Sequence, residues 1–160
     1  MNTSFILNGE LVSIDTSPDA LLVDILRQRF GLLGTRPGCT QGYCGTCSVL
    51  IDGRLTPSCM IPAFRITGRD VLTIEGFMQT QDFLDIERGF EQAGMSPCRY
   101  CVAGKVLTAQ ALLLETQDPQ IDEIREAVSA IYCRCTSYYA FIEGIRFAAE
   151  VRRRRVHAHA

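Results

Sequence analysis

Eight cysteines are the residues of this 160-residue chain whose type and spacing suit them to chemistry. Three of them, Cys39, Cys44 and Cys47, follow one another at C-x4-C-x2-C spacing, and Cys59 lies further along the chain. This spacing is typical of a 2Fe–2S site, and thiolates are the soft ligands that iron–sulfur clusters select. Nearby glycines, which reach positive φ, allow backbone N–H groups to turn towards the sulfurs. A zinc site or buried free thiols are the alternatives, and spacing and glycines together favour the cluster.

The other four cysteines form a second set, Cys98 and Cys101 followed after 31 residues by Cys133 and Cys135. Both pairs adjoin predicted helix starts, where unpaired N–H groups and the positive end of the helix dipole favour an anionic group. Four cysteines are also a normal ligand set for structural zinc, so the spacing alone leaves zinc and a cluster equally open. The first set shifts the prediction towards a second cluster.

Composition excludes several classes of function. The formal net charge of −2 argues against general nucleic-acid binding. No apolar run is long enough for a transmembrane helix, and no signal peptide is visible. We therefore expect a cytoplasmic protein, in a reducing compartment where cysteine clusters are more often metal sites than disulfides. No nucleotide-binding glycine fingerprint, P-loop or catalytic triad occurs, so no substrate site and no catalytic residue of the chain's own is expected.

The first half of the chain has the pattern of a small sheet with one helix. Residues 5–7 and 11–14 flank Asn8-Gly9, which predicts a hairpin with a type I′ turn. A helix is predicted from an N-cap at Ser17 to residue 30. Short strands are predicted at 48–51, 54–56 and 71–74. Two hairpins, one helix and a last strand predict a β-grasp domain over residues 1–76.

The second half changes to helical periodicity. Apolar residues recur at helical spacing near 81–92, 101–116, 119–131 and 138–154. Four short helices with short connections predict a four-helix bundle over residues 77–160. The predicted fold class is therefore α+β, with two domains that each carry four cysteines.

The complete pattern, C-x4-C-G-x-C-x11-C followed by C-x2-C-x31-C-x-C, resembles the small iron–sulfur subunit of the molybdenum hydroxylases. This family includes xanthine dehydrogenase and aldehyde oxidoreductase. The resemblance covers nearly the whole chain and includes Leu7-Asn8-Gly9, Ile51-Asp52-Gly53 and Cys133-Arg134-Cys135-Thr136. It implies a ferredoxin-like domain and a helical domain that each bind a 2Fe–2S cluster. The implied ligands are Cys39, Cys44, Cys47 and Cys59 for the first cluster and Cys98, Cys101, Cys133 and Cys135 for the second.

The function that the resemblance implies is electron transfer within an oxidoreductase complex. Electrons would pass from the molybdopterin of a large subunit through the two clusters to an FAD-binding medium subunit or another acceptor. Cys135 would approach the molybdopterin, and the partner's substrate would be a purine, another N-heterocycle or an aldehyde. No nucleic-acid or membrane partner is expected. The competing interpretations are a stand-alone two-cluster ferredoxin and a zinc-stabilised interaction protein that has lost redox function.

Three residues around the second set depart from the family pattern. Pro97 and Ser137 stand where a glutamine and a glycine are usual, which bears on contacts with the molybdenum cofactor. Arg99 stands in place of a glycine between the first two cysteines of this set. A cation there favours the more negative, reduced state of a cluster and so raises its potential. The alternative is that Arg99 faces solvent or pairs with an acid of the partner.

Overall fold

The computed structural model describes residues 1–158, and its first elements form the predicted hairpin. Strand β1 (Asn2–Leu7) pairs antiparallel with β2 (Glu10–Asp15). At the turn between them Asn8 and Gly9 have φ of 52° and 86°. Two consecutive positive φ angles are what a type I′ turn requires. The local sequence therefore sets this turn as predicted.

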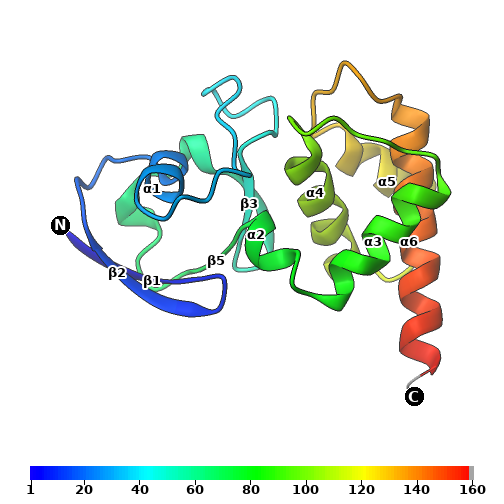
Figure 1. The fold of residues 1–160 in the computed structure, drawn as a ribbon, viewed down its shortest axis with the longest axis horizontal. Helices are drawn as coiled ribbons and strands as arrows, with labels where there is room; N and C mark the ends of the chain where they lie inside the picture. The colour runs from blue at the N-terminus through cyan, green and yellow to red at the C-terminus, as the bar shows by residue number, and fades with distance from the viewer. Residues whose placement is uncertain (159–160) are drawn as a thin grey trace.

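The hairpin belongs to a five-stranded mixed sheet of strand order β2-β1-β5-β3-β4 (Figure 1). Strands β3 (Ser48–Ile51) and β4 (Arg54–Pro57) are antiparallel, and β5 (Asp70–Leu72) runs parallel to β1. Helix α1 (Leu22–Gln28) buries its apolar face against this sheet. The core of this half consists of Phe5, Leu7, Leu22, Leu26, Val49, Ile66 and Val71. This arrangement confirms the predicted β-grasp.

Two boundaries of these elements were predicted wrongly, in both cases because long-range hydrogen bonds set them. Helix α1 begins at Leu22, not near Ser17, since the Leu22 N–H donates to the Ile61 carbonyl at 2.8 Å. The last strand ends at Leu72 and is followed by the short helix α2 (Ile74–Phe77). Between them the Thr73 N–H donates to the Asn8 side chain at 2.8 Å. The two 3-10 turns at Ser58–Met60 and Ala63–Arg65 complete this half.

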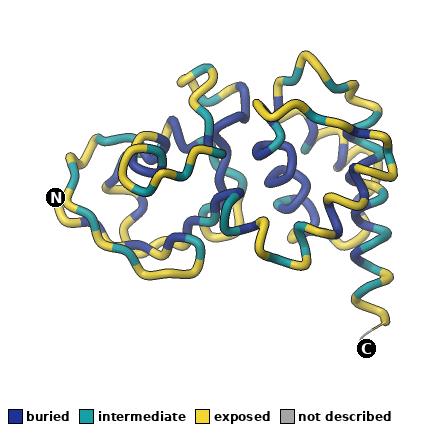
Figure 2. Tube along the Cα trace, viewed as in Figure 1, coloured by how far each residue is buried: buried dark blue, intermediate teal, exposed yellow. Residues whose placement is uncertain are grey.

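Four longer helices of the described chain make up the second half and confirm the predicted bundle. They are α3 (Gln81–Gln92), α4 (Val102–Glu115), α5 (Ile121–Val128) and α6 (Tyr138–Ala158). Figure 2 shows α4 as the most deeply buried of them, between the sheet and the other helices. Within residues 1–158, none of the helices has the length and apolar character of a membrane span. The domain limits 1–76 and 77–160 stay a prediction.

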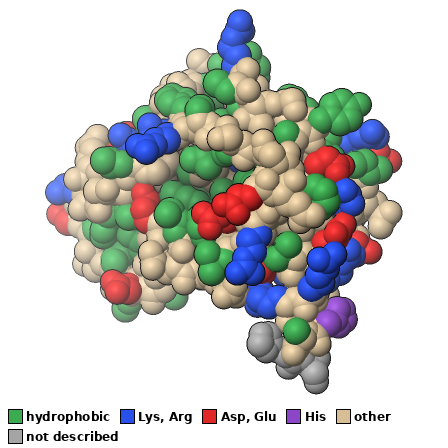
Figure 3. All heavy atoms as spheres, turned by 45° about the vertical axis from the view of Figure 1, so that its right-hand side comes forward, with side chains coloured by type: hydrophobic (Ala, Val, Ile, Leu, Met, Phe, Trp, Pro, Cys, Tyr) green, Lys and Arg blue, Asp and Glu red, His purple; other side chains and the backbone are tan. Residues whose placement is uncertain are grey.

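A buried ionic network joins α6 to α3. The Asp85 side chain is fully buried, and its Oδ2 lies 2.7 Å from Nη2 of Arg155. Nη2 of Arg152 donates to Oε1 of Gln110 on α4 at 2.7 Å and lies 3.6 Å from Asp82 Oδ2. Figure 3 shows basic and acidic side chains gathered near the C-terminal end of α6. Because a buried charge is costly when its partner is lost, this network should hold α6 firmly on α3.

We expect Asp85→Ala to lower the free energy of unfolding by about 3 kcal/mol, because Arg152 and Arg155 then share the single carboxylate of Asp82 and part of their charge loses its partner. Urea unfolding of the cluster-loaded chain, followed by helical circular dichroism, measures this change. The control is Glu143→Gln, which removes an exposed ion pair between Glu143 and Arg146, both of which lie on α6. That change should cost no more than about 0.5 kcal/mol. Equal effects of the two substitutions would contradict the stabilising role of the buried ionic network between α3 and α6.

Candidate metal centres

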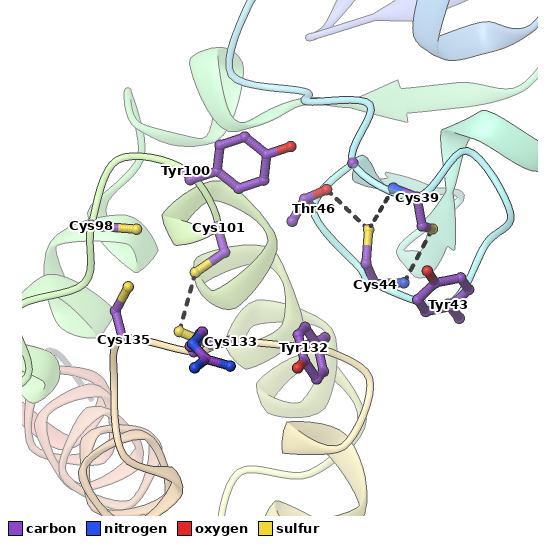
Figure 4. Close-up of a pocket in the computed structure, with 12 residues that line it drawn as sticks. Cys39, Tyr43, Cys44, Thr46, Cys98, Tyr100, Cys101, Tyr132, Cys133 and Cys135 are labelled. Atoms are coloured by element: carbon purple, nitrogen blue, oxygen red, sulfur yellow. Dashed lines mark hydrogen bonds between the residues drawn. The ribbon is translucent and has the colours of Figure 1, made fainter.

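The fold gathers the eight cysteines into the two predicted sets. Figure 4 draws six of them and shows that the two sets face each other. A cavity of about 590 Å³ lies between them. Its lining includes Cys39, Cys44, Cys98, Cys101, Cys133 and Cys135. The other two cysteines of the first set, Cys47 and Cys59, are buried and pack against Val23. All eight are free thiols.

The loop of the first set directs backbone N–H groups at its sulfurs. The Cys39 N–H donates to Cys44 Sγ, and the Cys44 N–H donates to Cys39 Sγ, both at 3.4 Å. The Gln41 N–H adds a third such bond to Cys39 Sγ at 3.4 Å. Gly42 and Gly45 have φ of 80° and 74°, the left-handed conformation that makes this geometry accessible. Burial raises the pKa of Cys39, but the N–H donors outweigh it and lower the pKa to about 6.

The buried half of the first set has the opposite electrostatics. Burial raises the pKa of Cys59 to about 11, and the adjacent thiol of Cys47 adds to the rise. A buried thiol of this kind loses its proton when a metal cation binds. The same site therefore offers Cys39, whose pKa is lowered, and Cys59, whose raised pKa means that a metal must displace its proton.

The second set surrounds the start of α4. Cys101 caps this helix, and its Sγ lies 3.5 Å from Cys133 Sγ. Burial raises the pKa of Cys101 to about 12, and the Cys133 thiol adds to it. Burial also raises the pKa of Cys133, but N–H groups of Thr136 and Cys135 help to lower it to about 6. Cys98 and Cys135 are exposed and adjacent, and the Cys98 thiol raises the pKa of Cys135.

The thiols meet in pairs and not around single points. No three His, Cys, Asp or Glu side chains of residues 1–158 are gathered so that they could hold one ion. The neighbouring pairs are Cys39 with Cys44, Cys47 with Cys59, Cys98 with Cys135, and Cys101 with Cys133. A 2Fe–2S cluster contains two irons, and each is held by two cysteines. Two pairs in each set therefore fit this group.

The two sets are joined by a close approach of main chains. The Tyr132 N–H, next to Cys133, donates to the Cys44 carbonyl at 3.1 Å. A Cβ at Gly45 would lie 2.3 Å from Ile131 Cδ1, and one at Gly104 would lie 2.4 Å from the Gly45 carbonyl oxygen. Only glycine fits at these two positions without movement of the backbone. The interface thus depends on residues without side chains.

Several residues of the site were not predicted. Tyr100 extends from the second set towards the first, and its ring lies 5.8 Å from the Arg36 guanidinium carbon (Figure 4). Thr46 Oγ1 is 3.1 Å from Cys44 Sγ. Lys105 is buried, with Nζ 5.0 Å from the centre of the Phe141 ring. Its position four residues after Cys101 places both on one helix face, a signal that was present in the sequence.

Comparison with known proteins agrees with this geometry. Residues 5–71 match a 2Fe-2S iron-sulfur cluster binding domain, and residues 73–146 match a second [2Fe-2S] binding domain. The fold and the site thus define an iron–sulfur protein with two cluster-binding domains.

Among its relatives is the nicotinate dehydrogenase small FeS subunit of Eubacterium barkeri, which is 38% identical over 90% of this chain and 92% of that one. A probable xanthine dehydrogenase subunit of Bacillus subtilis is 36% identical over 92% and 83%. The structure of quinoline 2-oxidoreductase from Pseudomonas putida 86 superimposes with a TM-score of 0.87 at 37% identity, over 96% of both chains. The chain belongs to the small iron–sulfur subunits of the molybdenum hydroxylases and is an electron-transfer subunit of such an oxidoreductase complex.

We expect Gly45→Ala to separate the two cysteine sets, because its Cβ would collide with the main chain at Ala130, 2.4 Å away. The magnetic interaction between the two reduced centres, measured by electron paramagnetic resonance, should weaken. Gly68→Ala is the matched control, since Gly68 also has a positive φ of 71° but has no atom within 4 Å of the added Cβ. An unchanged interaction in Gly45→Ala would show that the close approach is not required.

Proposed function

We propose that the first set binds one 2Fe–2S cluster through Cys39, Cys44, Cys47 and Cys59, and that Cys98, Cys101, Cys133 and Cys135 bind the other. The observation that carries this proposal is the pairing of thiols, two pairs in each set. The backbone N–H donors to Cys39 and Cys133 support it, since such bonds stabilise sulfur that bears negative charge. When bound, each cluster accepts and releases one electron.

The direction of transfer that we propose is from the second set to the first. Cys98 and Cys135 are exposed, so a partner's cofactor is able to approach this set closely. The connection onward from Cys133 consists of its peptide bond to Tyr132 and one hydrogen bond from Tyr132 N–H to the Cys44 carbonyl. A path of covalent bonds and a single hydrogen bond supports electron transfer between the sets.

The partners in this proposal are a large molybdopterin-binding subunit at the second set and an FAD-binding subunit at the first. Exposed tyrosines around the second set support a protein interface there, because tyrosine is enriched in interfaces. These are Tyr100, Tyr132, Tyr138 and Tyr139. The names of the three relatives refer to nicotinate, xanthine and quinoline, which are all N-heteroaromatic compounds, so this is the substrate class that we propose for the complex. Cys135 is the proposed nearest approach to the molybdopterin.

The cofactor assignment is tested by analysis of the purified full-length chain. About four iron and four acid-labile sulfide per chain, with two paramagnetic signals after reduction, are expected for two 2Fe–2S clusters. Cys98→Ala should abolish one signal and about half of the iron, and Cys47→Ala should abolish the other signal. Bound zinc without sulfide would refute the assignment, as would loss of both signals in each variant.

The partner assignment is tested by purification of the complex from its native source. A large molybdenum-containing chain and an FAD-containing chain should accompany this subunit, and the complex should oxidise an N-heteroaromatic substrate. In rapid mixing with substrate, the paramagnetic signal of the reduced second cluster should appear before that of the first cluster, as the proposed direction requires. A chain that purifies alone would instead indicate a stand-alone ferredoxin.

A further inference from the structure

Lys105 is the single lysine of the chain, since the other fifteen basic side chains are arginine. It lies in the first turn of α4 and is only 1% exposed. A buried ammonium group is costly unless an opposite charge or a comparable partner compensates it. The group that compensates the charge of Lys105 therefore has to lie close to it inside the fold.

The surroundings of Lys105 offer the cysteines of the second set as this partner. Lys105 follows Cys101, the N-cap residue of α4, by four residues and so lies on the same face of this helix. Lys105 and Cys133 line one small cavity together with Ser137. None of the carboxylates within residues 1–158 forms an ion pair with Lys105. The Phe141 ring adds a cation–π contact, which only partly offsets desolvation.

We propose that Lys105 holds a fixed positive charge against the second cluster and raises the reduction potential of that cluster. This inference rests on the proposed assignment of a 2Fe–2S cluster to the second set. Reduction adds one negative charge, so a cation in contact stabilises the reduced form more than the oxidised form. The effect persists because the contact is buried and is therefore little screened by solvent ions.

The same argument gives the neighbouring arginines a smaller role. Arg99 and Arg134 flank the cysteines in sequence, but both are exposed. Water and salt screen their charge. The cation that tunes the second cluster is therefore Lys105 rather than Arg99, which the sequence alone had suggested.

The test is a redox titration of the cluster-loaded full-length chain, followed by electron paramagnetic resonance. Lys105→Met, which keeps an unbranched side chain of similar length, should lower the midpoint potential of the second-set signal and leave the first-set signal unchanged. Lys105→Arg, which keeps the charge, should restore most of the potential. Arg99→Gln is the control for an exposed cation of the same loop and should shift the potential much less.

An unchanged midpoint potential in Lys105→Met with full iron content would overturn the inference, and so would equal shifts in Lys105→Met and Arg99→Gln. If Lys105→Met binds no second cluster, loading of Lys105→Arg decides, because retained loading identifies charge as the requirement. Loss of loading in both variants would show a steric role and refute the inference. Failure of the proposed function gives a different result, because the unmodified chain would then show no second signal.

Discussion

Four thiolates confined to a small, partly buried space repel one another, and much of this structure is explained by the need to balance that negative charge. The first set is balanced by main-chain N–H groups, which the loop presents because Gly42 and Gly45 adopt left-handed conformations. The second set lies at the start of α4. There the Thr136 N–H donates to Cys133 Sγ, and the buried Lys105 lines the same small cavity as Cys133. Loop conformation, helix placement and a buried cation are thus different solutions to one electrostatic problem.

The second requirement is that the two sets lie close together although they belong to different halves of the chain. Gly45 and Gly104 allow the loop of the first set to approach α4 without a Cβ between them. The sheet and the bundle also share a core, since Leu50 of β3 packs with residues of α4 such as Leu107. The halves are therefore fixed relative to one another at the point where electrons must cross.

The features that could be predicted from the sequence are those that short-range interactions determine. Asn8-Gly9 set the first hairpin. The eight cysteines predicted two sets because their type and spacing are read directly from the sequence, even though 31 residues separate the two pairs of the second set. The start of α1 was missed because the bond from Leu22 to Ile61 joins distant residues. Lys105 was missed because only the apolar residues of this helix, such as Val102 and Val106, were assigned to its buried face, and only the folded chain shows that Phe141 and Cys133 lie beside Lys105. Periodicity predicts which face is buried but not what a buried charge contacts.

The hydrogen bond from Tyr132 to Cys44 joins two main-chain groups, so almost any residue at position 132 preserves it. Proline alone, which lacks the N–H, would remove it. The Tyr132 side chain is 65% exposed and does not take part in this bond. Substitutions are therefore able to change the exposed surface at this position without altering the internal hydrogen bond. At this one residue the exposed side chain and the main-chain link between the two cysteine sets can therefore vary independently.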